Sequence, residues 1–515
     1  MSRAYGSEGM KASDRFAISH DKIPSLVLME RAALAVCDAV SANDACASGR
    51  NVRVYAGVGN NGADALACAR ILTDRGYRVE CFLVGDPDKA TDENKAQQHT
   101  LQAYGLEVHP YKKEEGRHPC DLVIDGLFGI GVNRAPEGVW LDAVTEMNAY
   151  GKEGAKVVAI DLPSGVNADD GSLPGACVSA DMTVTFAFAK TGVLLYPAAA
   201  HCGEILVRDI GIRASRKADA VYYADPSEVR LLKRDPAGHK GTFGKVLCVC
   251  GSQKTGGAAI LAARAVLASG AGMVRVFTDI ANRDAILQVL PEALIDTYDE
   301  SHPDEAATKA LLHAALDWSD SVVLGCGTGT GEIARQLTQT VLSDCNKPLV
   351  LDADALNLIA RDTALRSLCR ALGERGIPLV LTPHLAEFAR LTGRSVPECR
   401  KHLLTAPREL ADELHATVLL KDARSVVCSA RPDETYINIS GNDGMATAGS
   451  GDVLAGLLGA LILQSESARE ACCNGAYLHG LAGDRAALEV GKRGLTASDL
   501  IRHLRNVFFE TGTKE

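Results

Sequence analysis

The residues best suited to chemistry in the first part of the chain lie in glycine- and aspartate-rich loops that follow predicted strands. These loops are residues 57–64 (GVGNNGAD), 125–131 (DGLFGIG) and 161–166 (DLPSGV). Glycines let a turn approach a phosphate, whose charge is favoured by the helix that follows. An aspartate at the carboxyl end of a parallel strand points into the crevice where ligands bind. Three such loops together favour a ligand site over simple helix capping.

Polar side chains near these loops offer two kinds of chemistry. Lys190, after the strand predicted at 182–186, can pair with Asp161 as acid and base, or it can be a solvated surface lysine. The side chains of Asn60, Asn61 and Asp64 can cap a helix or coordinate a cation through oxygen. The residue types alone leave both alternatives open.

A second chemical segment lies near the C-terminus, at residues 441–452 (GNDGMATAGSGD). Its last four residues open a predicted apolar helix, so that consecutive backbone amides would form an anion hole for a phosphoryl group. Asp452 at the helix start can accept a proton from an attacking hydroxyl. The alternative is a helix cap in which Asp452 only complements the helix dipole.

Several further motifs flank predicted strands in the second part of the chain. In order they are residues 239–246 (HKGTFGKV), 325–329 (GCGTG), 352–357 (DADALN), 382–387 (TPHLAE) and 421–425 (KDARS). The last four each follow a strand, and the carboxyl ends of parallel strands share one sheet edge. His384, taken alone, can also be a structural histidine.

The elements that must position these loops alternate between short apolar runs and helical stretches, the pattern of parallel α/β sheets. Strands are predicted at 52–56, 79–84, 122–124, 157–160 and 182–186, then at 245–250, 274–277, 322–324, 349–351, 379–381 and 418–420. Helices are predicted at 63–75, 92–104, 452–463 and 471–488. This alternation favours a doubly wound, Rossmann-like sheet in the first part and a second α/β series after it.

The pattern weakens between Asp209 and Pro236, where the charged stretch 213–217 (RASRK) precedes a small apolar element near Val221. We therefore place a domain boundary there, giving domains 1–220 and 221–515. A chain of 515 residues agrees with two or three domains.

Composition excludes several classes of protein. A net charge of −11 argues against a protein that coats nucleic acid, although backbone amides can still hold small phosphates. The 16 cysteines show no zinc-type spacing and are expected to be small buried residues in a reducing cytosol. No apolar run reaches the length of a membrane span, and residues 1–9 lack the apolar segment of a signal peptide. We expect a cytoplasmic enzyme without a membrane or nucleic-acid partner.

The motifs GNNGAD, DGLFGIG, DLPSGV and FAFAKTG together resemble the NAD(P)H-hydrate epimerase family, over about residues 5 to 215. The resemblance implies a Rossmann-like three-layer sandwich. It also implies that the hydrated dinucleotide is held by Asn60, Asn61, Gly62, Ala63, Asp64, Gly129, Ile130, Gly131, Val132, Asn133, Arg134, Ala135 and Asp161. Asp161 and Lys190 would be catalytic.

The same resemblance implies that Asn61, Asp125 and Ser164 bind a potassium ion. These residues offer only hard oxygen ligands, which suit an alkali or alkaline-earth ion and not zinc. One departure is residues 29–33 (MERAA), where the family commonly has MENAG, so Arg31 is given no role.

The GSGD segment resembles the ribokinase-like fold, and the five motifs above narrow this to the ADP- or ATP-dependent NAD(P)H-hydrate dehydratase family, across about residues 225 to 510. The resemblance implies that the hydrated dinucleotide is contacted by Gly272, Gly327, His384 and Asp452. It implies that the nucleotide, with Mg²⁺, is held by Lys421, Asp422, Ala423, Arg424, Ser425, Asn442, Gly444, Met445, Ala446, Thr447, Ala448, Gly449, Ser450 and Gly451.

Two residues depart from the dehydratase pattern. Asp422 stands in a segment that is usually Lys-Gly-x-x-Thr, and Asp443 stands where a proline is usual. A carboxylate near a phosphate is unfavourable, so we expect the side chain of Asp422 to point away from the nucleotide.

Together the resemblances imply a repair enzyme for hydrated NADH and NADPH. One activity would epimerise the R and S hydrates, and the other would use ADP or ATP to dehydrate the S form. Phosphorylation of the hydroxyl would turn a poor leaving group into a good one. A ribokinase-like small-molecule kinase with an N-terminal nucleotide sensor or protein-binding domain is the alternative. We expect small-molecule substrates and a homo-oligomer, while the sequence does not distinguish ADP from ATP.

Overall fold

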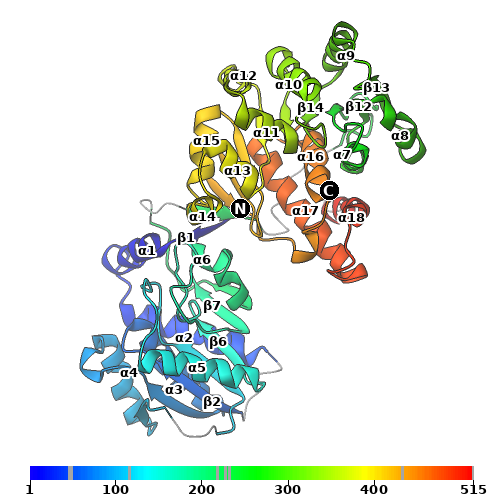
Figure 1. Cartoon of the computed structure of the whole chain (residues 1–515). Helices are drawn as coiled ribbons and strands as arrows, with labels where there is room; N and C mark the ends of the chain where they lie inside the picture. Colours follow the sequence, from blue (N-terminus) through cyan, green and yellow to red (C-terminus); the bar gives the residue numbers. More distant parts are fainter. Residues whose placement is uncertain are drawn as a thin grey trace. The chain divides into compact units, whose positions relative to one another are not determined.

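The computed structural model divides the chain into two compact units (Figure 1). One comprises Arg3–Val221, and the other comprises Tyr222–Glu515 together with Met1–Ser2. The structure describes residues 1–43, 50–113, 118–215, 220–224, 229, 234–430 and 434–512. Arg216 and Lys217 of the charged stretch predicted at the boundary lie outside these residues. The assignment of domains 1–220 and 221–515 stays a prediction.

The first unit contains a parallel sheet in the order β4-β3-β2-β5-β6-β7-β9. Its strands are β2 (Asn51–Ala56), β3 (Arg78–Leu83), β4 (Val108–Pro110), β5 (Leu122–Gly126), β6 (Lys156–Ile160), β7 (Met182–Phe186) and β9 (Glu204–Arg208). A short parallel pair joins β1 (Ser2–Tyr5) and β8 (Ala189–Lys190). The strand order reverses between β2 and β5, and such a switch point is where open α/β sheets bind ligands.

Alternating strand residues of this sheet enter two separate cores. Val52 and Val54 of β2 pack with α2 (Ser25–Ser41) and α3 (Asn60–Asp74), whereas Tyr55 packs with α5 (Val139–Lys152) on the other face. The remaining helices are α1 (Ser7–Ser19), η2 (Pro87–Lys89), α4 (Asp92–Ala103), α6 (Thr191–Leu194) and η3 (Ala198–His201). Helices on both faces of a parallel sheet confirm the predicted Rossmann-like three-layer arrangement.

The second unit is built on a sheet whose strands follow the order β13-β12-β11-β14-β15-β16-β17-β18-β19. Its strands are β11 (Lys245–Val249), β12 (Met273–Asp279), β13 (Leu294–Tyr298), β14 (Ser321–Leu324), β15 (Leu349–Leu351), β16 (Leu379–Leu381), β17 (Thr417–Leu420), β18 (Val426–Ser429) and β19 (Thr435–Ile437). The strands are parallel up to β17, and β18 and β19 continue the sheet in antiparallel fashion. The small element predicted near Val221 is β10 (Ala220–Tyr223).

Two hydrophobic cores again cover the two faces of this sheet. One contains residues of α7 (Gly256–Ala268), α8 (Arg283–Val289), α16 (Ser450–Leu461), α17 (Ala468–Val490) and α18 (Ala497–Gly512). The other contains residues of α9 (Glu305–Trp318), α10 (Glu332–Asp344), α11 (Ala353–Arg361), α12 (Thr363–Glu374), α13 (Leu385–Thr392), α14 (Val396–Lys401) and α15 (Ala406–Leu414). Short 3₁₀ turns lie at η5 (Ile280–Asn282) and η6 (Asp443–Met445). The predicted α/β class is confirmed for both parts of the chain.

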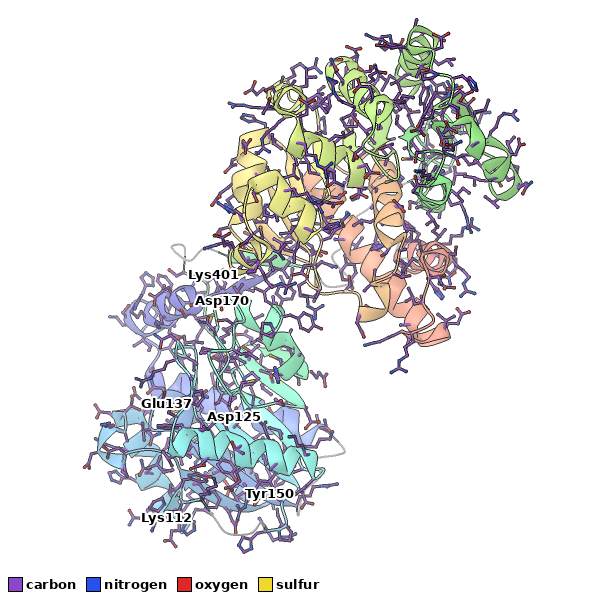
Figure 2. The ribbon with its side chains drawn as sticks, in the orientation of Figure 1. Lys112, Asp125, Glu137, Tyr150, Asp170 and Lys401 are labelled. Carbon is purple, nitrogen blue, oxygen red and sulfur yellow. The ribbon has the colours of Figure 1, made fainter. Side chains whose placement is uncertain are left out.

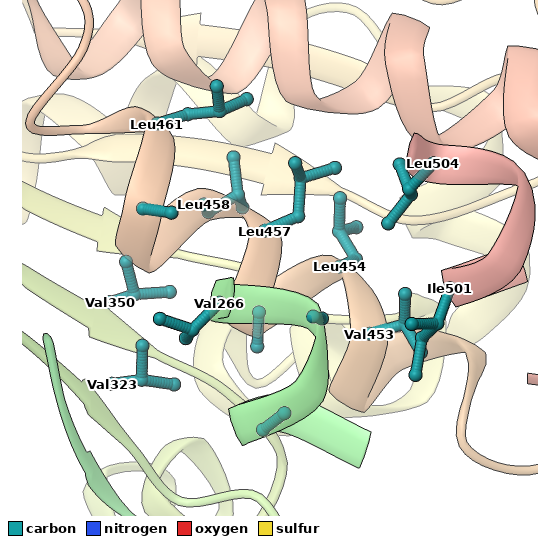
Figure 3. Close-up of a cluster of buried hydrophobic side chains, with 14 of the residues drawn as sticks. Val266, Val323, Val350, Val453, Leu454, Leu457, Leu458, Leu461, Ile501 and Leu504 are labelled. Carbon is teal, nitrogen blue, oxygen red and sulfur yellow. The ribbon is translucent and has the colours of Figure 1, made fainter. Parts of the chain in front are cut away.

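Helix α16 runs through the first of these cores, where its leucines contact Val266, Val323 and Val350 (Figure 3). It packs closely on α7, because a Cβ atom on Gly456 would lie 2.2 Å from the carbonyl oxygen of Ala262. This packing fixes the start of α16, the segment that carries Asp452.

The described cysteines are all free thiols, and all but Cys120 are buried, as expected from their scattered spacing. Among the helices that the structure describes, none is both long and apolar enough for a membrane span.

Candidate functional sites

A cavity of about 1020 Å³ opens beside the switch point of the first unit. Its walls include Asn60, Asn61 and Asp64 from the start of α3, the loop residues 129–135 after β5, and Asp161 and Lys190. Two of the predicted substrate residues, Gly62 and Ala63, are instead buried in the first turn of α3. Gly62 is needed there for steric reasons, since a Cβ atom would lie 1.7 Å from the carbonyl oxygen of Gly57.

An ion pair of Lys190 and Asp161 lies in the wall of this cavity. The buried Nζ of Lys190 donates to Oδ1 of Asp161, and also to Thr185 Oγ1 and to the carbonyl oxygen of Phe186, both at 3.1 Å. Asp161 follows β6 directly and has a left-handed backbone with φ of 69°. The two predicted side chains therefore meet, and the lysine ammonium is held by three oxygen acceptors.

Two further carboxyl groups face the same cavity, those of Asp14 on α1 and Asp64 on α3. Burial raises the pKa of Asp14, against the effect of the nearby Lys190. Burial, then the charges of Asp161 and Asp14, raises the pKa of Asp64 well above its usual range. No sequence motif points to Asp14, because α1 precedes the alternating α/β series and no element was predicted there. Its spacing from Met10 and Ile18, which share one helix face and also line the cavity, was the available signal.

The predicted cation ligands lie together at the cavity, whose wall includes Asn61. Oδ1 of Asp125 accepts from the hydroxyl of Ser164 at 2.6 Å, and its Oδ2 accepts from the backbone amide of Ser164 at 2.8 Å. Asn61 Nδ2 donates to the carbonyl oxygen of Phe128 at 2.9 Å, and the amide of Phe128 donates to Ser164 Oγ at 3.0 Å. These contacts connect the loops after β2, β5 and β6.

Asp125 is fully buried at the end of β5, within the unit as drawn in Figure 2. Burial raises its pKa to about 6, against the hydrogen bonds from Ser164 and Leu127. Among the described residues, no cationic side chain pairs with it. A buried carboxylate with only neutral donors and neighbouring oxygen ligands fits an alkali cation in its donor chemistry.

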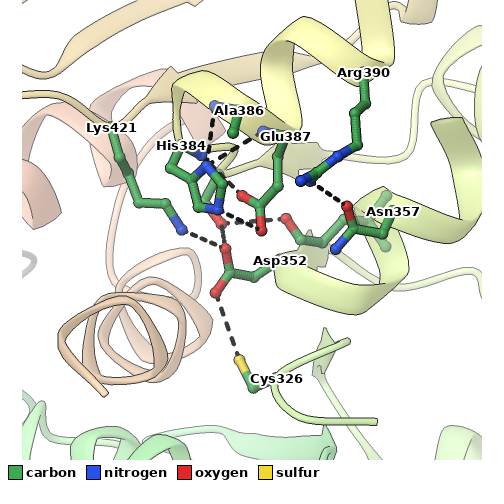
Figure 4. Close-up of polar contacts among 10 residues, drawn as sticks. Cys326, Asp352, Asn357, His384, Ala386, Glu387, Arg390 and Lys421 are labelled. Atoms are coloured by element: carbon green, nitrogen blue, oxygen red, sulfur yellow. Dashed lines mark hydrogen bonds and ion pairs between the residues drawn. The ribbon is translucent and has the colours of Figure 1, made fainter. Parts of the chain in front are cut away.

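In the second unit, a polar cluster lies at the carboxyl ends of β14 to β17 (Figure 4). Oδ1 of Asp352 accepts from Lys421 Nζ at 2.6 Å and from Thr382 Oγ1 at 2.7 Å. The thiol of Cys326 lies 3.7 Å from Oδ2 of the same carboxylate. Burial opposes the charge of Lys421, but Asp352 and Glu387 together raise its pKa.

Asp452 lies in the first turn of α16 and faces this cluster. Ligand atoms of Cys326, Asp352 and Asp452 all lie within 4.8 Å of one another. Burial, and next the charge of Asp352, raises the pKa of Asp452 to about 6. A Cβ atom on Gly451 would lie 3.4 Å from Lys421 Nζ, so the backbone at the helix start and the lysine ammonium are close neighbours.

His384 caps α13, next to the cluster. Its Nδ1 accepts from the backbone amides of Ala386 and Glu387 at 3.1 and 3.2 Å, and its Nε2 lies 3.3 Å from a carboxylate oxygen of Glu387. Burial raises the pKa of Glu387. His384 therefore caps the helix while half of its side chain stays exposed, and its predicted substrate contact stays a prediction.

The glycines predicted to contact substrate lie at different edges of the sheet. Gly327 follows β14 beside the cluster, where its backbone with φ of 65° approaches Thr255. Gly272 precedes β12 at the amino edge, and a Cβ atom there would lie 1.8 Å from the carbonyl oxygen of Lys240. The structure therefore does not bring Gly272 to the other predicted residues, and its substrate contact stays a prediction.

The segments predicted to hold the nucleotide, residues 421–425 and 442–451, follow β17 and lead into α16, respectively. The carboxylate of Asp422 lies 3.9 Å from Arg400, and that of Asp443 is exposed and pairs with Lys492 at 2.6 Å. Asp422 and Asp443 therefore both have cationic neighbours.

Arg31, the departure from the epimerase pattern in the first unit, is on the surface, with its guanidinium next to Gly211.

His479 on α17 lies near this site and belongs to none of the sequence motifs. It is buried, contacts the backbone of Ser450, and its Nε2 has no hydrogen-bond partner in the described part of the chain. Burial lowers its pKa to about 4, so the ring is neutral at physiological pH.

Two known families match the chain, one over each part, in the same order as its motifs. Residues 25–192 match the family described as YjeF-related protein N-terminus, and residues 246–506 match the NAD(P)H-hydrate dehydratase family. The second match alone spans about half of the chain.

Curated relatives match nearly the whole chain. The bifunctional NAD(P)H-hydrate repair enzyme Nnr of Moorella thermoacetica is 36% identical over 507 residues, which are 95% of this chain and 94% of the relative. The Nnr enzyme of Thermofilum pendens is 38% identical, over 96% and 94% of the two chains, and that of Escherichia coli is 34% identical, over 89% and 85%.

Among solved structures, the ADP/ATP-dependent NAD(P)H-hydrate dehydratase of Bacillus subtilis, co-crystallised with ATP and Mg²⁺, is 29% identical. It has a TM-score of 0.49, with 56% of this chain and 99% of that chain covered.

Proposed function

The chain belongs to the bifunctional NAD(P)H-hydrate repair enzymes, and on this basis we propose how its two sites divide the work. The protein repairs hydrated NADH and NADPH by two activities, epimerisation of the hydrate and its nucleotide-dependent dehydration. We assign epimerisation to residues 1–220 and dehydration to residues 221–515. Each assignment rests on the polar site found in that part of the chain.

The epimerase site is the cavity beside the switch point of the first sheet. It is large enough for much of a dinucleotide, and it places a lysine–aspartate pair next to the substrate space. The backbone amides at the start of α3 suit the pyrophosphate, while Asp161 and Lys190 move protons at the hydroxyl-bearing carbon. Residues 129–135 contribute a further part of the cavity wall.

We assign the potassium ion to the oxygen groups of Asn61, Asp125 and Ser164. When bound, the ion would supply the positive charge that the buried Asp125 lacks. These residues also join the loops after β2, β5 and β6 by hydrogen bonds, so they fix the loops at the cavity relative to one another.

In the dehydratase site, Asp452 accepts the proton of the substrate hydroxyl as that oxygen attacks the terminal phosphate of the nucleotide. The amides of Ser450 and Gly451 and the ammonium of Lys421 stabilise the transferred phosphoryl group. Phosphate then leaves with the former hydroxyl oxygen, the neighbouring ring carbon loses a proton to water, and the double bond of the reduced nicotinamide is restored. Mg²⁺ bound with the ADP or ATP would neutralise phosphate charge, and the carboxylate of Asp352 is a suitable ligand for it.

The assignment of the dehydratase site rests mainly on the position of Asp452 and its neighbours. Its carboxylate lies at the start of α16, beside Asp352 and Cys326 and close to Lys421. A general base with a pKa of about 6 is mostly ionised at neutral pH yet still basic enough to take a proton.

The test is to incubate the protein with mixed hydrate epimers, Mg²⁺ and either ADP or ATP. We expect recovery of the reduced nicotinamide absorbance together with release of inorganic phosphate. Accumulation of a stable phosphorylated product, without either signal, would mean that the second unit is a small-molecule kinase.

Two further assignments are proposed from the sequence. We propose a cytoplasmic location, supported by the free and mostly buried cysteines, and a homo-oligomeric state. Light scattering of the purified protein tests the second, with a monomer as the result that would exclude it.

A further inference from the structure

Helix α1 contributes a carboxyl group to the epimerase cavity that no motif of the sequence identified. Asp14 lines the cavity with Met10 and Ile18 of the same helix. The other ionisable groups that line it are Asp64, Arg134, Glu137, Asp161 and Lys190. Asp14 and Asp64 make no side-chain hydrogen bond or ion pair among the described residues, so their carboxyl groups are free to meet a ligand.

Epimerisation of the hydrate needs proton transfer on both faces of one carbon. The hydroxyl-bearing carbon is bonded to the ring nitrogen, whose lone pair can expel the hydroxyl group once an acid has protonated it. Water must then return to the opposite face and lose a proton to a base. One acid–base pair such as Asp161 and Lys190, fixed on one wall, can serve only one face.

Resting on the proposed function of this cavity, we propose that Asp14 is a further catalytic residue of the epimerase, the acid–base group for the second face of the ring. The protonated carboxyl group of Asp14 donates its proton to the hydroxyl oxygen as the C–O bond breaks. Water leaves, and the electron pair of nitrogen forms a C=N⁺ bond. Water then adds to the other face as the electron pair returns to nitrogen, and its surplus proton passes to the carboxylate of Asp161. In the reverse direction the two groups exchange roles.

Three features favour Asp14 over the other carboxyl groups. Asp161 is already bonded to Lys190, Thr185 and the amide of Phe186. Asp64 lies in the first turns of α3, next to the amides suited to the pyrophosphate. Asp14 is carried by α1, an element separate from both.

The surroundings of Asp14 also favour the protonated form that an acid requires. It is half-buried, and burial and the charge of Asp161 both raise its pKa, whereas Lys190 lowers it. Asp64 and Glu137 add carboxyl groups to the cavity, and Arg134 adds a cation. On this face of α1, Asp14 lies between the apolar side chains of Met10 and Ile18. Its carboxyl group is therefore partly withdrawn from water.

The test uses the full-length chain with Asp14→Asn and Asp14→Glu, and Glu8→Gln as the matched control. Glu8 lies on the same helix, is exposed, and pairs with Lys11 at 2.8 Å, and it does not line the cavity, so its loss removes a carboxylate away from the site. We expect Asp14→Asn to lower the epimerisation kcat on the order of 10²-fold or more, with little change in KM. Asp14→Glu should restore part of the rate, and Glu8→Gln should match wild type.

The pH profile gives a second readout. The wild-type rate should fall as pH rises through the pKa of the acid, and Asp14→Asn should lose this dependence. A rate for Asp14→Asn within a factor of three of wild type, or an unchanged pH profile, would overturn the proposal. Dehydration of the S hydrate with nucleotide should proceed normally in every variant, and an unchanged far-UV circular dichroism spectrum and melting temperature show that the first unit is folded. If wild-type protein itself does not interconvert the epimers, the proposed function fails, and not the role of Asp14.

Discussion

A carboxyl group that is withdrawn from water and placed beside another carboxylate holds its proton to higher pH, and Asp452 is such a residue. Its position in the first turn of a helix would normally favour the charged form. Burial and Asp352 outweigh this effect. The sequence pattern indicated the start of the helix and the position of Asp452. It did not indicate these neighbours, because Asp352 is about a hundred residues away in the chain and Cys326 is farther still.

This environment predicts a pH dependence for dehydration. The base acts only when ionised, so kcat/KM should fall as pH drops below about 6, with a slope of one proton. The measurement is the initial rate of dehydration of the S hydrate at saturating nucleotide across this range. A rate that stays constant well below pH 6 would show that Asp452 is not the base.

The cation site gives a second residue-scale prediction. Asp125→Ala removes the acceptor for both the hydroxyl and the amide of Ser164, so epimerisation should weaken and lose any response to K⁺. Dehydration should be nearly unchanged. Asp88→Ala, at an exposed position in the same unit, is the control. Equal loss of both activities in a well-folded Asp125 variant would refute the assignment of separate sites.

At the scale of elements, the sequence predicted the buried strands closely, since short apolar runs leave little freedom in placing them. The strand predicted at 182–186 matches β7, and those at 349–351 and 379–381 match β15 and β16. The starts of two helices were predicted late: α3 begins at Asn60 and α16 at Ser450, because polar and glycine residues form their first turns. The start of α4 at Asp92 was predicted correctly. The strands β18 and β19 were missed, since antiparallel pairing depends on partners that periodicity does not reveal.

The same limits apply to the sites. Loops that follow strands were identifiable, because sheet topology brings them to one edge. Asp14 and His479 lie on helices and not in loops that follow strands, so sheet topology does not place them. Their contacts depend on tertiary packing.

The close contact of α16 with α7 predicts the effect of a single methyl group. Gly456→Ala would place Cβ 2.2 Å from the carbonyl oxygen of Ala262, so the helices must separate, with a loss of about 1–3 kcal/mol in the free energy of unfolding. Gly257→Ala on α7 meets nothing within 4 Å and should change stability by no more than about 0.5 kcal/mol. Denaturant unfolding measures both. Equal stability of the two variants would contradict the packing described.

At the scale of the whole molecule, each unit has its own sheet and its own pair of cores. A protein comprising residues 1–220 should therefore fold alone and epimerise the hydrate without any nucleotide. The measurement is the epimer ratio over time, beside a sample without protein. An insoluble or inactive fragment, while the full chain is active, would show that the two-domain assignment is wrong.

We propose that this chain holds two chemically independent sites, with Asp452 as the base of one and Asp161 paired with Lys190 in the other. The most direct test supplies pure R hydrate, Mg²⁺ and nucleotide to full-length Asp452→Asn and Asp161→Asn, and follows epimer ratio and recovery of reduced nicotinamide. Asp452→Asn should epimerise at the wild-type rate but lose dehydration on the order of 10²-fold or more, with nucleotide binding and melting temperature retained. Asp161→Asn should dehydrate S hydrate normally and fail to accelerate use of the R form. If Asp452→Asn keeps more than about a tenth of the dehydration rate, above the 10² loss expected for a general base, or if either variant loses both activities while folded, the account is contradicted.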